Sequence, residues 1–326
     1  MITIVGGSGF IGSRLSRRLK EKNTAFQIID KRVGSTFPDE TIVADVRDLE
    51  SLIPAIKGEV IINLAAEHRD DVTPKSLYDE VNVVGAKHVC DVAEAHKINK
   101  IIFTSSVAVY GFAPVGTDET GTINYFNDYG RTKYEAEQVY RNWQKKDPEK
   151  RTLVIIRPTV VFGEQNRGNV YNLLKLIASG KFAMVGNGKN VKSMAYVENI
   201  AAFLEYSINF GPGVHLYNYV DKPDFNMNQL VKRVNKALGK KESIGIRIPY
   251  PIGYTLGKIL DVAAALSGIK FPISSIRIKK FCSDTSFDSS APQSGFKAPV
   301  HLETGLSNTI KHEFLQKNEG ELFYSE

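Results

Sequence analysis

Six short apolar runs that alternate with helical patterns limit how this chain can fold more than any other feature. The runs are continuous rather than alternating in hydrophobicity, which is typical of strands buried on both faces of a sheet. They cover residues 2–5, 25–30, 41–44, 60–65, 100–105 and 153–158. Between them, segments such as 10–19 and 129–144 repeat apolar residues at helical spacing. The alternation predicts an α/β fold of the Rossmann type, with a doubly wound parallel sheet.

The sequence changes in character after residue 166, where loops and helical patterns replace the regular alternation. We predict that residues 1–166 form a nucleotide-binding domain to which 190–220 returns, adding a late strand to the sheet. Residues 167–189 and 221–326 are predicted to form a smaller C-terminal α/β lobe that binds substrate. Such a lobe is expected to close over the carboxyl edge of the sheet, where ligands bind in folds of this kind.

Composition excludes several classes of protein. The chain has 326 residues, of which 42% are hydrophobic and 24% charged, and this argues against disorder. Its net charge of +6 fits either simple solubility or attraction to an anion, such as a diphosphate or an acidic membrane. Basic runs are not interleaved with aromatics, which argues against nucleic acid as a partner. Cys90 and Cys282 are not in a Cys-x-x-Cys motif, so we expect a reducing cytoplasm and no zinc site or disulfide framework.

A glycine-rich segment follows the first apolar run and opens the first helical pattern. In "ITIVGGSGFIGSRL", Gly6 permits a tight turn, Gly9 lets the backbone approach a pyrophosphate, and Gly12 lets the helix pack on the strand. Free N–H groups at the start of such a helix attract an anion. The alternative is a glycine-rich turn without a ligand, and a second signal is needed to decide.

Asp30 supplies the second signal, because it ends the second apolar run. An acid at this position accepts hydrogen bonds from both ribose hydroxyls and repels a 2′-phosphate, which favours NAD over NADP. Lys31 and Arg32 follow at once and are the residues that would instead hold a 2′-phosphate. Asp45 and Val46 come after the third run and are expected to flank the adenine, with a helix N-cap as the alternative for Asp45.

A Tyr-x-x-x-Lys motif and a preceding serine are the candidates for proton transfer. Tyr129 and Lys133 are four apart in a helical pattern and therefore share a face. A free phenol, with a pKa of ~10, is a poor base at neutral pH, but an adjacent ammonium and the positive nicotinamide both favour the phenolate. Ser106 follows the fifth run, where its hydroxyl is expected to bond the reacting oxygen. The alternatives are a capping serine and a core tyrosine.

Together these motifs resemble the extended short-chain dehydrogenases/reductases, and they occur in that family's order. The matching pieces are Gly6-x-x-Gly9-x-x-Gly12, "NLAA" (63–66), Asn82, "SSVAVYG" (105–111), Tyr129-x-x-x-Lys133 and "RP" (157–158). The resemblance implies catalysis by Ser106, Tyr129 and Lys133, with Tyr129 as the base when hydride leaves for NAD. It also implies further cofactor contacts, namely Phe10, Ile11, Leu64, Ala65, Ala66, Asn82, Ser105 and Pro158.

Two apolar residues reduce the number of reaction types that this chain could catalyse. Dehydratases of the family carry an Asp-Glu pair after the catalytic serine or threonine, and this chain has Val107 and Ala108 there. These side chains transfer no protons, so epimerisation, reduction or oxidation of a hydroxyl remains.

The segments 64–72, 157–175, 186–203 and 217–231 are similar to those of epimerases that act on N-acetylglucosamine carried by undecaprenyl diphosphate, in bacterial O-antigen assembly. The resemblance implies an NAD-dependent sugar 4-epimerase at the inner face of the cytoplasmic membrane. A UDP-sugar 4-epimerase and an NAD(P)-dependent nucleotide-sugar 4-reductase are the alternatives. Implied or candidate substrate contacts are Glu67, His68, Ser106, Val107, Tyr129, Arg167, Asn169, Lys192 and Arg277. Lys192 stands where the family generally has arginine, and Ser193 and Asn199 stand where it has aspartate.

Two interpretations of residues 248–278 stay open. The segment is apolar with scattered charges and keeps helical spacing. It is either a helix docked on the protein core or an interfacial helix whose Lys258, Lys270 and Arg277 lie near anionic headgroups. The family often forms homodimers through two helices of the sheet domain, including the one that carries Tyr129, and a homodimer is therefore expected here.

Overall fold

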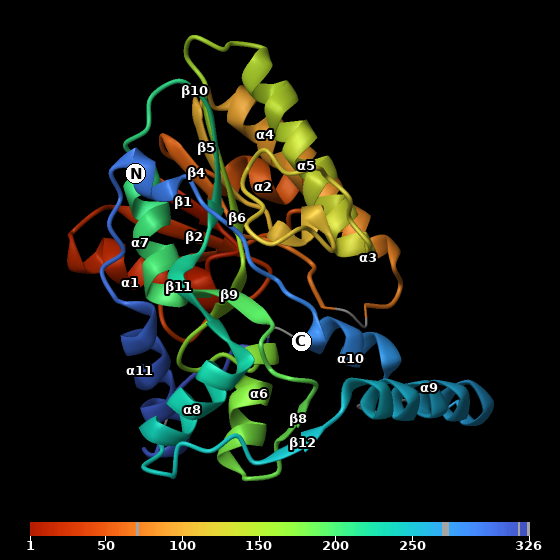
Figure 1. Ribbon diagram of the computed structural model, residues 1–326. Helices are drawn as coiled ribbons and strands as arrows, with labels where there is room; N and C mark the ends of the chain where they lie inside the picture. The colour runs from red at the N-terminus through yellow and green to blue at the C-terminus, as the bar shows by residue number, and fades with distance from the viewer. Residues whose placement is uncertain (70–71, 269–273, 319, 325–326) are drawn as a thin grey trace.

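The computed structural model describes residues 1–69, 72–268, 274–318 and 320–324, and at its centre lies a parallel sheet (Figure 1). Its seven strands follow the order β10-β6-β5-β4-β1-β2-β3, and every pairing is parallel. The strands are β1 (Ile2–Val5), β2 (Phe26–Asp30), β3 (Thr41–Val43), β4 (Val60–Asn63), β5 (Lys100–Thr104), β6 (Thr152–Pro158) and β10 (Gly213–Tyr219). This confirms the predicted doubly wound α/β fold.

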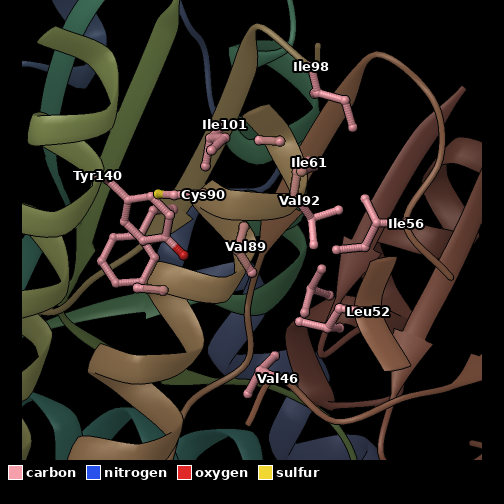
Figure 2. Close-up of a cluster of buried hydrophobic side chains, with 14 of the residues drawn as sticks. Val46, Leu52, Ile56, Ile61, Val89, Cys90, Val92, Ile98, Ile101 and Tyr140 are labelled. Carbon is pink, nitrogen blue, oxygen red and sulfur yellow. The ribbon is translucent and has the colours of Figure 1, made fainter. Parts of the chain in front are cut away.

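Helices cover both faces of the sheet, which explains why inner strands such as β1, β4 and β6 are largely apolar and fully buried. On one face lie α1 (Phe10–Glu21) and α7 (Val197–Ser207), and on the other lie α2 (Leu49–Ala55), α4 (Gly85–Ala95) and α5 (Asp128–Lys145) (Figure 1). Along β6, Leu153 and Ile155 pack on the α4 side, whereas Val154 and Ile156 pack on the α1 side. Figure 2 shows the core on the α4 side, where Val89, Val92 and Cys90 meet Ile61 and Ile101 of the sheet.

Between β4 and α4 the chain forms a short helix, α3 (Ser76–Tyr78), and then a π-helical turn, η1 (Asp79–Val84). A 3-10 turn, η2 (Val107–Tyr110), follows β5 directly. Both turns lie beside α5. Wide helical turns of the π type often occur at functional sites.

A second lobe lies below the carboxyl ends of the strands in Figure 1. It contains a three-stranded sheet in the order β11-β9-β7 and a two-stranded sheet in which β12 pairs with β8. The strands are β7 (Val160–Phe162), β8 (Ala183–Val185), β9 (Val191–Tyr196), β11 (Asp221–Asn226) and β12 (Ile246–Ile248). The helices are α6 (Asn169–Ala178), α8 (Met227–Ala237), α9 (Tyr250–Ser267), α10 (Ser275–Cys282) and α11 (Leu302–Phe314), and a 3-10 turn, η3 (Ala291–Ser294), precedes α11.

The segment 190–220 divides between the two sheets. Its first part, β9, pairs with β7 and β11 rather than with the main sheet, while α7 and β10 complete the main layers. The domain boundary at residue 166 stays a prediction. Helix α9 differs from the other lobe helices, because it projects from the side of the molecule and packs on α10 (Figure 1).

Candidate active site

The glycine turn between β1 and α1 forms a cradle that only glycine can line. Gly6 has a φ of +76°, and a Cβ there would lie 2.5 Å from the backbone nitrogen of Ala65. A Cβ on Gly12 would lie 2.4 Å from the carbonyl oxygen of Gly7, so the bare residue lets α1 pack against the turn. No side chain caps α1, which begins at Phe10 after Gly9. The first N–H groups of the helix are thus placed to bind a diphosphate, and the cradle fits a dinucleotide.

Asp30, at the end of β2, faces this turn. Its Oδ2 accepts a hydrogen bond from the backbone N–H of Ser8 at 3.0 Å, and Oδ1 accepts one from Arg32 N–H at 3.4 Å. Burial is the larger effect and raises the pKa of Asp30, while these two hydrogen bonds oppose the shift. The carboxylate therefore orders the glycine turn as well as marking the predicted ribose position.

We expect Asp30→Ala to lower the amount of NAD that copurifies with the protein by at least about tenfold. The reason is that charge-assisted hydrogen bonds contribute ~1.5–3 kcal/mol each. Chromatographic analysis of nucleotide released from the purified protein measures this. The control is Asp39→Ala, because Asp39 is an exposed acid of the loop before β3. Equal NAD content in the wild type and Asp30→Ala would contradict the assignment.

The residues predicted to flank the adenine and nicotinamide lie at the ends of the next strands. Asp45 makes a two-pronged ion pair with Arg47, which lowers the pKa of its carboxyl, and Asp48 rather than Asp45 caps α2. Val46 is buried under Gly85 at the start of α4. Leu64, Ala65 and Ala66 follow β4, and Pro158 ends β6. Lys31 follows Asp30 at the end of β2, and Ile11 follows Phe10 at the start of α1.

Asn82, in η1, braces the loop that follows β4. Its Nδ2 donates to the carbonyl oxygen of Glu67 at 3.0 Å and to Oγ1 of Thr132 at 2.9 Å, and its Oδ1 accepts from Glu67 N–H at 2.9 Å. Both amide hydrogens are therefore used within the protein. Asn82 is a predicted cofactor contact, and the structure shows in addition that it ties the loop to α5.

Ser106 and Tyr129 come together where η2 packs against the start of α5, and Lys133 lies one turn further along that helix. Gly130 makes this approach possible, because a Cβ there would lie 2.5 Å from the carbonyl oxygen of Ala108. Ser106 caps η2 by accepting a hydrogen bond from Ala108 N–H at 3.1 Å, and its hydroxyl also bonds the Tyr129 phenol. The same serine therefore caps η2 and contacts the Tyr129 hydroxyl.

Burial dominates the electrostatics of the Tyr-Lys pair. It raises the pKa of Tyr129, although the hydrogen bond to Ser106 partly opposes this. Burial lowers the pKa of Lys133 to about 7, against the attraction of the Glu137 carboxylate. The Lys133 ammonium lies 4.4 Å from the centre of the Phe103 ring, and the residue is only 2% exposed. A positive group bound next to Tyr129 would lower the pKa of the phenol, which is the shift that a base needs.

A buried polar network behind these residues is absent from the sequence-based prediction. Arg157 of β6 binds both carboxylate oxygens of Glu137, at 2.8 and 2.6 Å, and both side chains are at most 3% exposed. Ser105 donates to the same carboxylate at 2.6 Å, so this predicted cofactor contact faces α5. Arg157 also donates to the Tyr110 hydroxyl, which in turn donates to Asn218 of β10. The network therefore links α5 to β6, to η2 and to β10.

The predicted sugar contacts lie in the loop after β4. The Glu67 side chain accepts from His68 N–H and lies 3.4 Å from Arg69. His68 reaches solvent, yet loss of hydration lowers the pKa of its imidazole, and the nearby Lys133 charge acts in the same direction. Val107 is the first residue of η2, next to Ser106. Asp70 and Asp71, in the same loop, lie outside the described residues.

Arg167 and Lys192, two of the predicted lobe contacts, have identified partners within the protein. Arg167 pairs with the buried Glu313 at 2.8 Å and stacks on Tyr171. Lys192 donates to the carbonyl oxygens of Lys280 and Ser283, at 3.0 and 2.6 Å, and thereby holds the end of α10. Burial lowers the pKa of Lys192 to about 8. Asn169 begins α6, and Arg277 lies on α10.

Ser193 and Asn199 have structural partners as well. Ser193 donates to Asp224, and Asn199 pairs with both backbone groups of Val300. Each therefore ties its strand or helix to a distant segment.

The C-terminal segment reaches the nucleotide site, which no local sequence signal indicates. Oε2 of Glu321 accepts hydrogen bonds from the backbone N–H and the hydroxyl of Ser35, across 286 positions of sequence. Phe323 packs on Phe10 at 5.8 Å between ring centres and pairs with the backbone of Gln165 and Arg167. Residues 320–324 thus border the cradle formed by the glycine turn.

A dinucleotide cradle on a parallel sheet, with a Ser-Tyr-Lys cluster at the carboxyl edge, defines an enzyme of the short-chain dehydrogenase/reductase type. Residues 2–218 match the NAD dependent epimerase/dehydratase family, and the chain belongs to that family. The cofactor is therefore NAD, as the sequence predicted.

Relatives and solved structures agree with this assignment. The chain is 48% identical to the N-acetyl-alpha-D-glucosaminyl-diphospho-ditrans,octacis-undecaprenol 4-epimerase of Escherichia coli O157:H7, over 99% of this chain and 98% of that protein. Among structures, it resembles the UDP-N-acetylglucosamine 4-epimerase of Bacillus cereus, with a TM-score of 0.75 and 17% identity, covering 95% and 97% of the two chains. It also resembles the Thermus thermophilus UDP-glucose 4-epimerase solved with NAD, with a TM-score of 0.71 and 17% identity over 95% and 98%. At such low identity these two structures support the fold.

Proposed function

We propose that the protein is an NAD-dependent 4-epimerase that acts on N-acetylglucosamine linked through a diphosphate to undecaprenol, giving the N-acetylgalactosamine form. The reaction type is inferred from the number of proton-transfer groups in the site. Ser106, Tyr129 and Lys133 supply one proton-transfer centre, and Val107 and Ala108 supply no second one. A single centre suits oxidation and reduction at one carbon and does not suit dehydration. The relative at 48% identity supports the substrate.

The residues divide the work of epimerisation. Bound NAD would supply the acceptor and the donor of the hydride at C4 of the sugar. Tyr129 accepts the proton of the C4 hydroxyl and later gives it back, while Ser106 donates a hydrogen bond to the same oxygen. Lys133 stabilises the phenolate by its charge and holds the nicotinamide ribose. Inversion requires the 4-keto sugar to turn within the site, so that its other face meets the hydride.

The lobe supports a substrate other than an ordinary nucleotide sugar. Lys192 is committed to the end of α10, and Ser193 and Asn199 are committed to Asp224 and Val300. Nucleotide-sugar epimerases generally have arginine at position 192 and aspartate at positions 193 and 199. Because the three residues of this protein bind other parts of the protein, they do not form the same nucleotide-recognition site. A UDP-sugar 4-epimerase is the second candidate, since the cradle and the catalytic cluster would be unchanged.

A paired-substrate assay tests the proposal. The purified protein is offered the undecaprenyl diphosphate-linked sugar and UDP-N-acetylglucosamine in parallel, without added NADH. We expect isomer formation from the lipid-linked sugar, at a kcat/KM at least about a hundredfold above that for the UDP sugar. Preference for the UDP sugar would overturn the substrate, and stoichiometric consumption of NADH or NADPH would indicate a reductase instead.

The proposed substrate indicates where in the cell the protein works. We propose that it works in O-antigen or related surface-polysaccharide synthesis, at the cytoplasmic face of the inner membrane, where the lipid carrier presents its sugar. The homodimer expected from the family stays a prediction, and light scattering on the eluted protein tests it.

A further inference from the structure

Helix α9 exposes an apolar stripe along most of its length. The stripe consists of Ile252, Leu256, Ile259, Val262 and Leu266, with exposed fractions of 61, 48, 59, 60 and 85%. At 100° per residue, these five positions fall on one side of the helix. Gly253 and Gly257, the buried residues of α9, fall on the opposite side.

The glycine side of α9 is already used. Gly257 packs against Ser275 and Ile278 of α10, where a Cβ would lie 2.8 Å from the Ser275 nitrogen. Asp261, the one acidic side chain of α9, accepts hydrogen bonds from Ser275 N–H at the start of α10. The apolar stripe therefore faces away from the described part of the protein. No helix among the described residues is long and apolar enough to cross a bilayer. A helix with one exposed apolar side, as α9 has, is suited to lie in the plane of a membrane surface.

Basic side chains accompany the stripe. Lys258 is exposed on α9, and α10 adds Arg277, Lys279 and Lys280, with no acidic residue in that helix. A pair of helices that combines an exposed apolar face with an excess of positive charge is complementary to a bilayer that contains anionic lipid. A second copy of this chain would bring the same positive charges together, which disfavours self-association here. Lys270 lies outside the described residues.

Helix α10 joins this surface to the active site. The ammonium of Lys280 lies 4.8 Å from the ring centre of Phe126, and that of Lys279 lies 5.4 Å from the ring centre of Phe112. The two rings pack at 5.1 Å between centres, tilted by 32°, and are each nearly half exposed. Phe126 precedes Asn127, which caps α5 by accepting from Gly130 N–H at 2.9 Å. Tyr129 is thus three residues from the aromatic pair that α10 covers.

We propose that the apolar stripe of α9 and the basic side of α10 dock the protein on an anionic bilayer. This inference rests on the proposed function for its use, since the sugar of the proposed substrate is carried by a lipid that stays in the membrane. The docking itself depends only on the exposed residues of the two helices.

Vesicle sedimentation with the full-length protein tests the docking directly. We expect the wild type to bind vesicles of phosphatidylethanolamine with phosphatidylglycerol, and Ile259→Glu/Leu266→Glu to weaken binding at least about tenfold. Both residues are exposed, so the change leaves the core intact. The matched control is Leu315→Glu, an exposed leucine after α11 with an exposed fraction of 55%, which is expected to bind as the wild type does. High salt is expected to weaken binding by the wild type.

A second measurement separates this inference from the proposed function. A short-chain, water-soluble lipid diphosphate carrying N-acetylglucosamine reports epimerisation without vesicles, and the double variant is expected to keep wild-type activity on it. Failure of the wild type to bind vesicles, or equal binding by the double variant, overturns the docking even if epimerisation is intact. Loss of dimers in the double variant, with vesicle binding unchanged, assigns the stripe to self-association and also overturns it. Vesicle binding without epimerisation supports the docking and overturns the proposed function.

Discussion

Replacing Tyr129 with phenylalanine is expected to lower kcat by a factor of about 10²–10⁴, the usual contribution of a positioned acid or base. The variant keeps the aromatic ring and removes only the hydroxyl that interacts with Ser106. Proton removal from the C4 hydroxyl then has no acceptor, whereas the NAD cradle around Gly6 is untouched. The rate of isomer formation from the lipid-linked sugar measures the effect, and NAD content shows whether the cofactor remains bound.

Tyr134→Phe is the matched control for this experiment. Tyr134 lies one turn further along α5 and packs beside Val109 and Tyr110, away from the Ser106 hydroxyl. We expect its kcat to stay within about threefold of the wild type, because removing a peripheral hydroxyl is a small change. A Tyr129→Phe variant with near-normal kcat would mean that another group removes the proton.

Replacing Glu137 with glutamine is expected to lower the free energy of unfolding by about 3–5 kcal/mol, which is typical when one partner of a buried ion pair is removed. The guanidinium of Arg157 would then be buried with no counter-charge, in the network that joins α5 to β6. Chemical denaturation measures the loss. The control is Glu135→Gln on the same helix, where the 40% exposed side chain pairs with Arg131 and is expected to contribute less than about 1 kcal/mol.

The same variant is expected to change the pH dependence of activity. The Glu137 carboxylate favours the charged form of Lys133, so its loss lowers the pKa of Lys133 below about 7. Because the protonated lysine stabilises the phenolate, activity is lost as pH rises through that pKa. The basic limb of the pH–rate profile should therefore move to lower pH in Glu137→Gln and stay in place in Glu135→Gln. An unchanged limb would show that Glu137 acts on stability alone.

Local patterns in the sequence were enough to predict the main sheet. Its inner strands are short, buried on both faces and separated by helices, so they leave continuous apolar runs, as β6 does with "LVIIRP". The glycine spacing and Tyr129-x-x-x-Lys133 are likewise short patterns that can be recognised without the rest of the chain. The close approach of Gly6 to the backbone of Ala65, by contrast, became visible only in the structure.

Contacts between distant residues were not predictable in the same way. Nothing near Arg167 or Lys192 indicates that the first is paired with Glu313 or that the second holds the end of α10. Their positive charge suggested an anion as the ligand, whereas the tertiary structure supplies a carboxylate and backbone carbonyls. Glu137 and Arg157 come from separate elements, and only the packing of α5 on β6 makes them a buried pair.

The contact between Glu321 and Ser35 means that parts of the nucleotide site are synthesised at very different times. The glycine turn is made among the first residues, but the segment that borders it is made some 286 positions after Ser35. During synthesis, Ser35 and the glycine turn therefore leave the ribosome long before Glu321 does. This border of the nucleotide site can be completed only after residues 320–324 have been made.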